Sequence, residues 1–271
     1  MNFQGLKRAS RQCLLDSGIQ PRRLTLLFLL CFYALSIPCD CLTYMLEYQI
    51  NRLSGLSAAT LRNRYYLWTS TITVVINVVW VLWAAGYSAF ALHLSRGQQV
   101  SFASFPTGFR LFGKVLALAF LQFLYIWLWS ILMVIPGIIA AYRYRMALYA
   151  LLDDPSISAS EAINISKRLT YGHKQELFLL DLSYIWYYLL GAAAILPVSL
   201  YNYGMIPIPQ VWQWFALVYL FSIILHIAVE ALFRAQVQTT YAHAYNWLLS
   251  LDQSRRQGFG TRYDSNPGFT Q

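Results

Sequence analysis

Long apolar stretches alternate with short polar segments along the chain. The apolar stretches cover residues 24–46, 65–94, 114–135, 137–152, 177–200 and 211–233. A helix rises about 1.5 Å per residue, so about 20 apolar residues cross the roughly 30 Å hydrocarbon layer of a membrane. The pattern predicts an all-α polytopic membrane protein, with about six transmembrane helices forming one domain over residues 24–251.

The longest uncharged stretch runs from Val115 to Tyr142 and exceeds what one crossing needs. Pro136-Gly137 interrupts it. Proline removes an amide donor and glycine permits almost any backbone angle, so we expect a turn there between the third and fourth spans, at the outer surface. Residues 137–152 would give only about 24 Å of helix, which leaves open whether this segment crosses the membrane completely.

The polar segments carry patterns of their own. Residues 1–23 place Phe3, Leu6, Cys13 and Leu14 near one helical face among basic residues, which predicts an amphipathic helix on the membrane surface. The tail, residues 252–271, is rich in Gly, Ser, Arg and Gln without apolar periodicity, so we expect it to be disordered.

Two short helices are predicted between spans. Phenylalanines at 102, 105, 109 and 112 indicate an amphipathic lead-in to the third span, which Pro106 should confine to its second half. Ser158 and Glu161 have capping-box spacing before a helix that ends near Gly172.

The distribution of basic residues favours six crossings over five. If the chain crosses the membrane six times, the segments on the same side as the two termini contain 15 lysines and arginines, and those on the opposite side contain 3. Cytoplasmic loops are the ones enriched in these residues. The sequence therefore predicts that both termini and residues 153–176 are cytoplasmic.

Composition narrows the functional class. Hydrophobic residues make up 58% of the chain and charged residues 11%, which leaves no room for a separate soluble catalytic domain. The net charge is +9, and the basic residues lie next to apolar segments. This position favours anionic lipid headgroups over nucleic acid as their binding partner. All four cysteines fall between Cys13 and Cys41, unlike a disulfide framework. Known catalytic spacings are missing from the sequence, so we expect neither an enzyme nor a cofactor.

Several short motifs resemble those of a bacterial integral-membrane family catalogued as a domain of unknown function (DUF975-like). They are Gly108 to Lys114, Ile135 to Ile139, Tyr142 to Ala147, Asp154-Pro155, Ser158 with Glu161-Ala162, Gly172 to Lys174, Glu176 to Phe178, Leu180 to Leu182, and the Leu6 to Ala9 start. The family is similar in layout to the membrane domain of some glycerophosphodiester phosphodiesterases. The resemblance implies a compact six-helix membrane domain and carries over no catalytic residues.

Six ionisable residues are expected at membrane depth, where each charge costs about 2.5–3.5 kcal/mol at a helix centre. They are Asp40, Arg143, Arg145, Asp181, His226 and Glu230. Structural ion pairs explain such residues better than a functional cavity does. Because Asp40 and Arg143 lie about 9 and 10.5 Å from the presumed outer helix ends, we predict that they pair, with Arg145 as the alternative partner of Asp40.

Metal binding is weighed at three places. His226 and Glu230 lie four residues apart on one helical face, Cys39 and Cys41 flank Asp40, and Asp153-Asp154 follows the fourth span. A polar helix contact explains the first better, two cysteines without a second pair are weak evidence, and a helix stop explains the third. No metal site is predicted.

Two functions remain open. The favoured one is a non-enzymatic membrane module that binds a partner membrane protein or an anionic lipid, since the amphipathic basic segments offer surfaces for both. The alternative is a transporter of small solutes or lipids, which a broken helix pair and buried charges would serve.

Overall fold

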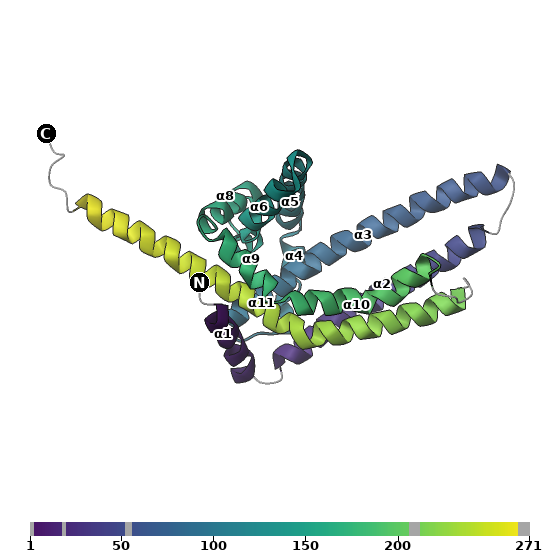
Figure 1. Ribbon diagram of the computed structural model, residues 1–271, viewed down its shortest axis with the longest axis horizontal. Helices are drawn as coiled ribbons and strands as arrows, with labels where there is room; N and C mark the ends of the chain where they lie inside the picture. The colour runs from purple at the N-terminus through teal and green to yellow at the C-terminus, as the bar shows by residue number, and fades with distance from the viewer. Residues whose placement is uncertain (1–2, 18–19, 52–55, 206–211, 265–271) are drawn as a thin grey trace.

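The computed structural model describes residues 3–17, 20–51, 56–205 and 212–264, which consist of helices joined by short connections (Figure 1). In chain order the helices are α1 (Phe3–Asp16), α2 (Gln20–Asn51), α3 (Leu56–Ser95), the 3-10 helix η1 (Phe102–Ser104), α4 (Thr107–Arg110), α5 (Phe112–Leu132), α6 (Val134–Tyr144), α7 (Ala147–Asp153), α8 (Ala159–Leu169), α9 (Lys174–Leu182), α10 (Ile185–Asn202) and α11 (Trp212–Asp264).

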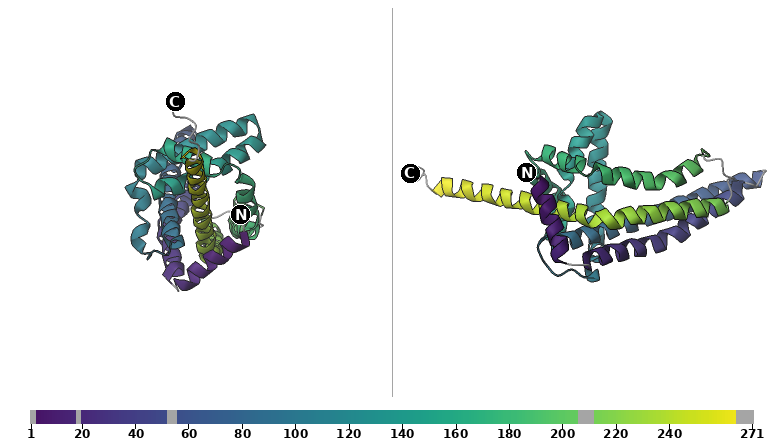
Figure 2. Two further views of the ribbon diagram at one scale, coloured as in Figure 1. Left: turned by 90° about the vertical axis from the view of Figure 1, so that its left-hand side faces the viewer. Right: turned by 60° about the horizontal axis from the view of Figure 1, so that its bottom comes forward.

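Four long helices form a bundle. It consists of α2, α3, α10 and the first half of α11, which run alongside one another (Figures 1 and 2). Helix α11 contacts each of the other three. Helix α1 lies across the end of the bundle where α2 begins and α3 ends, hereafter the α1 end. The opposite end, where α2, α10 and the start of α11 meet, is hereafter the far end.

An aromatic cluster fixes the α1 end of the bundle. The ring of Phe105, from the connection after α3, is fully buried against Phe28 of α2 and Phe90 of α3. Tyr87 stacks on Phe105 in parallel, with ring centres 6.0 Å apart. Phe105 therefore anchors this connection in the bundle. Helix α4 starts directly after Pro106, which confirms the predicted limit of that helix.

Within the described residues, five helices are long and apolar enough to cross a membrane. They lie within α2, α3, α5, α10 and α11. Helices α5 and α6 pack as a hairpin that points away from the α1 end in a direction different from the bundle (Figures 1 and 2). The side chains of this hairpin are largely exposed, as expected for a surface that faces lipid.

The turn of this hairpin lies three residues before the predicted position. Helix α5 ends at Leu132, Met133 is extended with φ −162° and ψ 152°, and α6 begins at Val134. Pro136 is the third residue of α6, where a missing amide hydrogen costs no helical bond. The proline thus lies in the first turn of the returning helix, and Met133 makes the turn between the two helices.

Gly137 allows the two helices of the hairpin to touch. A Cβ atom at this position would lie 2.1 Å from Ser130 Oγ and 3.0 Å from Ser130 Cα. The first distance is shorter than any real contact and the second is tighter than most, so a Cβ atom here would require Ser130 to shift.

We expect Gly137→Ala to lower the stability of the hairpin by about 1–3 kcal/mol, because the added methyl group overpacks the contact with Ser130. Pro136→Ala should change stability by less than about 1 kcal/mol, since alanine is also accepted in a first helical turn. Thermal unfolding of both variants in detergent measures the difference. Equal effects of the two substitutions would contradict the assignment of the close contact to Gly137.

The predicted fourth span, 137–152, is not one helix. Helix α6 ends at Tyr144 and α7 begins at Ala147, so the longer piece has 11 residues. Ser166 Oγ of α8 accepts a hydrogen bond from the Met146 amide at 3.1 Å and donates one to the Arg143 carbonyl at 2.9 Å. These bonds replace helical ones at the break, which the local sequence does not reveal.

The predicted fifth span, 177–200, also divides. Helix α9 ends at Leu182, and α10, which is long and apolar enough to cross a membrane, begins at Ile185. The Lys7 ammonium of α1 donates a hydrogen bond to the Ser183 carbonyl at 2.9 Å and lies 4.1 Å from the Tyr184 ring centre. A remote cation thus stabilises a carbonyl that the break releases from the helix.

Helix α11 continues well beyond the predicted last span, 211–233. Residues 252–264, predicted to be disordered, are helical to Asp264, and residues 265–271 lie outside the described residues. Asp252 pairs with Arg256 one turn later and with Arg168 of α8, each at 3.2 Å. Helix propagation from a packed segment costs little, so these polar residues extend the helix although they lack apolar periodicity.

Two other local predictions are confirmed. Ser158 caps α8 by accepting a hydrogen bond from the Glu161 amide at 3.2 Å, and Gly172 has a φ of +81° after the helix. Helix α1 is amphipathic as predicted, with Leu14 buried and Arg8 exposed.

Candidate functional site

The predicted membrane-depth residues separate into distinct sites along α11, not one cluster. Tyr219, Glu230 and Tyr241 of this helix are each 11 residues apart. Eleven residues complete three helical turns and about 16.5 Å, so the three side chains share one face. Each of them takes part in a hydrogen bond between a carboxylate and a tyrosine hydroxyl.

Asp40 bonds to Tyr219 and does not pair with an arginine. The Tyr219 hydroxyl donates a hydrogen bond to Asp40 Oδ2 at 2.5 Å. Among the ion pairs of the described residues, none joins Asp40 to Arg143 or Arg145, so the predicted pair is wrong. The prediction compared depth alone, whereas Asp40 is on α2, which packs against α11.

Removing this bond should cost about 1.5–3 kcal/mol, the usual range for a hydrogen bond to a charged group. We expect Asp40→Asn and Tyr219→Phe to be coupled by about 1 kcal/mol or more in a double-mutant cycle. Asp40→Asn and Arg143→Gln should be additive within about 0.5 kcal/mol. Unfolding in detergent measures both cycles, and the reverse pattern of coupling would restore the Asp40–Arg143 pair.

Glu230 is buried and has two partners. The Tyr187 hydroxyl of α10 donates to Glu230 Oε1 at 2.5 Å, and Arg234, one turn along α11, pairs with Oε2. The Arg234 guanidinium lies 5.1–5.2 Å from three ring centres, those of Phe28, Trp80 and Tyr87. This cation is therefore held by a carboxylate and by aromatic faces from α2 and α3, which compensate its burial.

His226 does not reach Glu230, although both lie on α11. Its Nδ1 is buried without a hydrogen-bond partner among the described residues, and its ring meets the edge of Tyr33 at 6.3 Å between centres. In the described part of the chain, no group of three His, Cys, Asp or Glu side chains is arranged to hold a metal ion.

Asp181 is the centre of the most extensive site. Arg145 pairs with Asp181, and the hydroxyls of Tyr142 and Tyr241 donate to the same carboxylate at 2.7 and 2.5 Å. The Arg145 guanidinium lies 4.4 Å from the Tyr241 ring centre, and Tyr188 shares a hydrogen bond with the Tyr241 hydroxyl at 2.9 Å. The site joins α6, α9, α10 and α11, so it positions the hairpin relative to the bundle.

Asp153 lies outside the predicted spans and, like Asp181, has an arginine and a tyrosine hydroxyl as partners. It pairs with Arg96 at 2.5 Å and accepts a hydrogen bond from the Tyr245 hydroxyl at 3.0 Å. The neighbouring Asp154 accepts hydrogen bonds from the Ser156 hydroxyl at 2.6 Å and the Ser156 amide at 3.0 Å, which together lower the pKa of its carboxyl group. Helix α7 ends at Asp153, so the predicted helix stop is confirmed.

Sequence reasoning missed the tyrosines and Arg234. The 11-residue spacing of Tyr219, Glu230 and Tyr241 and the four-residue spacing of Glu230 and Arg234 were readable signals. Ending the last span at Phe233 separated Glu230 from Arg234 and Tyr241.

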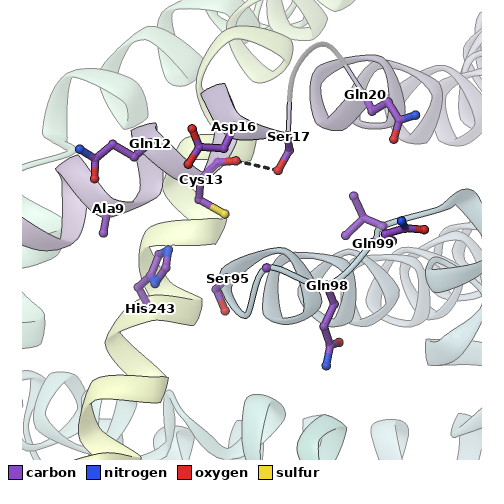
Figure 3. A pocket seen from close by; sticks show the side chains of 12 residues that line it. Ala9, Gln12, Cys13, Asp16, Ser17, Gln20, Ser95, Gln98, Gln99 and His243 are labelled. Atoms are coloured by element: carbon purple, nitrogen blue, oxygen red, sulfur yellow. Dashed lines mark hydrogen bonds between the residues drawn. The ribbon is translucent and has the colours of Figure 1, made fainter.

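A pocket of about 790 Å³ opens beneath α1, between the end of α3 and α11 (Figure 3). Polar side chains supply most of its lining, namely Gln12, Asp16, Ser17, Gln20, Ser95, Gln98, Gln99 and His243, with Cys13 among them. Amides and hydroxyls both donate and accept hydrogen bonds, so this surface suits a polar ligand.

Cys13, His243 and Asp16 share the pocket without the geometry of a nucleophilic site. The Cys13 thiol donates a hydrogen bond to the Leu94 carbonyl at 2.9 Å and so is directed into the bundle. Burial and the nearby Asp16 carboxylate raise the pKa of the Cys13 thiol, which keeps it protonated. Reactive cysteines have the opposite shift.

The comparison with family models concerns the second half of the chain. Residues 130–250 match the model of the family described as "Protein of unknown function (DUF975)". This part of the chain is DUF975-like. The matched region runs from the end of α5 into α11 and includes the Glu230 and Asp181 sites, while α1 to α3 precede it. No curated protein and no solved structure matches the chain.

Proposed function

We propose that this protein is a non-enzymatic membrane module that binds a partner membrane protein or lipid at its α1 end. The observation that carries the proposal is the position of α1. It lies across the end of the bundle, where Ser10 Oγ donates to the Gln236 carbonyl at 3.0 Å and Cys13 to Leu94. The polar pocket beneath it offers a binding surface next to the membrane.

The internal pairing of the deep carboxylates supports a structural role for them. Asp40, Asp181 and Glu230 each accept a tyrosine hydroxyl, and the latter two also pair with arginine. Solute pathways require polar groups that can exchange partners with the solute. Carboxylates that are already hydrogen-bonded to neighbouring helices are better suited to holding helices together. This favours a binding module over a transporter.

We further propose that the protein resides in a bacterial cell membrane with both termini and the α1 end in the cytoplasm. Basic residues from distant parts of the sequence gather at or near the α1 end, in α1, at the start of α2, at the end of α3 and in α8 to α9: Lys7, Arg8, Arg11, Arg22, Arg23, Arg96, Lys167, Arg168 and Lys174. Arg62 and Arg64 lie near the start of α3, away from α1. The positive-inside rule supports this orientation.

Cysteine accessibility tests the orientation. In a variant in which Cys13, Cys31, Cys39 and Cys41 are serine, a cysteine at the exposed Ser160 of α8 should resist an impermeant maleimide in intact cells. The matched control is a cysteine at Tyr203, which is 77% exposed after α10 and should be labelled. Labelling of Ser160→Cys with protection of Tyr203→Cys would reverse the proposed orientation.

Native mass spectrometry of the full chain in mild detergent tests the binding function. We expect the purified protein to retain a lipid or protein whose mass is then identified by fragmentation. Ala9→Trp fills the pocket beneath α1 and should lower retention of a pocket ligand about tenfold, whereas Gln4→Trp adds the same ring to α1 away from the pocket lining.

Two outcomes would contradict the module. Retention no higher than that of an unrelated membrane protein would reject binding. Ion- or solute-driven flux in vesicles containing the purified chain, abolished by Glu230→Gln but not by Ala9→Trp, would support the transporter instead.

A further inference from the structure

A second depression lies on the other side of α1. It has a volume of about 290 Å³ and is bounded by α1, the start of α2 and the middle of α11. The residues that line it are Arg11, Leu14, Leu15, Arg22, Leu232, Ala235 and Gln236. We refer to it as the arginine groove.

Two arginines from different helices line this groove. Arg11 comes from α1 and Arg22 from the first turn of α2, and both side chains are exposed. Neither has a hydrogen bond or an ion pair within the described part of the chain, in contrast to Arg145 and Arg234. Two positive charges from separate helices that line one depression form a complement to a doubly coordinated anion such as phosphate.

The remaining walls of the groove are apolar and accessible. Leu15 is 71% exposed and Leu232 is 73% exposed. From Leu232 an exposed apolar stripe continues along α11 toward the far end through Ala228, Ile224, Phe221 and Leu217. The helical rise from Leu232 to Leu217 is about 22 Å, which exceeds the roughly 15 Å thickness of the hydrocarbon layer of one leaflet.

We propose that the arginine groove binds one anionic glycerophospholipid, with its phosphate between Arg11 and Arg22 and an acyl chain along the stripe from Leu232 to Leu217. This inference rests on the proposed function and specifies lipid as a partner. A soluble phosphate compound would satisfy the guanidinium groups but not the apolar stripe. A lipid satisfies both, because its phosphate lies at the level where the apolar part of α2 begins.

The test uses the full chain, delipidated in detergent and titrated with phosphatidylglycerol by native mass spectrometry. The Arg11→Gln/Arg22→Gln variant should bind the first phosphatidylglycerol at least about tenfold more weakly than the unaltered chain, since each basic residue near an anionic surface contributes measurably. The matched control is Arg8→Gln/Arg23→Gln. It removes the same charge from the same two helices outside the groove and should change the affinity less than about threefold.

A third variant tests the apolar part. Leu232→Ser should also weaken phosphatidylglycerol binding, and phosphatidylcholine should bind the unaltered chain more weakly than phosphatidylglycerol. Because Arg11, Arg22 and Leu232 are exposed, unchanged thermal unfolding of each lipid-free variant shows that the fold is intact.

Equal loss of phosphatidylglycerol affinity in the two double-arginine variants would overturn the proposed binding at the groove, because it would indicate attraction by net charge alone. Binding of glycerol 3-phosphate as tight as that of phosphatidylglycerol would overturn the role of the acyl chain. Either result leaves the proposed module standing if the purified chain still retains a partner that Ala9→Trp displaces.

Discussion

Replacing Arg234 with glutamine should destabilise the protein by about 3 kcal/mol, because it leaves the Glu230 carboxylate without its cation. Glu230 is 6% exposed and Arg234 is 9% exposed, so water cannot replace the lost partner. Breaking a buried ion pair from one side is far more costly than the net value of the pair. The substitution also removes the cation from the faces of Phe28, Trp80 and Tyr87.

The measurement is unfolding of the purified chain in detergent. Glu230→Gln/Arg234→Gln should be more stable than Arg234→Gln, since neutralising both partners removes the unpaired charge. Arg256→Gln is the matched control. Its ion pair with Asp252 has the same four-residue spacing but the arginine side chain is 60% exposed, so the loss should stay below about 1 kcal/mol. Similar losses for Arg234→Gln and Arg256→Gln would show that burial does not determine the cost.

Replacing Gly86 with alanine should destabilise the protein by about 3 kcal/mol or more. A Cβ atom at Gly86 of α3 would lie 1.8 Å from the Phe105 carbonyl oxygen and 2.9 Å from Phe105 Cα. The obstruction is backbone, so no change of rotamer relieves it. Either α3 or the segment before α4 must move, which withdraws the fully buried Phe105 ring from its contacts with Phe28 and Phe90.

Gly113→Ala is the control for this prediction. Gly113 is also helical, in the first turn of α5, and a Cβ atom there would meet nothing within 4 Å. Since alanine is the better helix former, stability should stay equal or rise by up to about 1 kcal/mol. Comparing thermal unfolding of the two variants separates the close contact from the loss of a glycine as such. A well-folded Gly86→Ala protein with unchanged stability would contradict the packing of Phe105 on α3.

The sequence predicted the long helices because their signal is local. Helices α2, α3, α5 and the first half of α11 follow directly from apolar runs long enough to cross a membrane, in which the backbone must bond to itself. The cap at Ser158 and the start of α4 after Pro106 are equally local, since each depends on residues within one turn.

The breaks between helices were harder to place. The apolar run through residues 137–152 contains no proline or glycine after Gly137, yet the helix ends at Tyr144. Ser166 of α8 and Thr170, which follows this helix, supply the hydrogen bonds that make this break favourable, and both bond to the Arg143 carbonyl. A segment whose residues could form a continuous helix can still break when side chains from another helix provide hydrogen-bond partners for its backbone.

By itself the sequence determined that the protein is a helical membrane protein, and that Asp40, Asp181 and Glu230 need partners in an apolar environment. Arg234 follows Glu230 by four residues on one helix, so this pairing was also written in the sequence. The tertiary structure decided the other partners: Tyr219 of α11 meets Asp40 of α2, and Arg145 meets Asp181 of α9, because these helices pack together. Depth along a helix follows from counting residues, whereas the direction in which a side chain points and the helix it faces depend on how all the helices pack together.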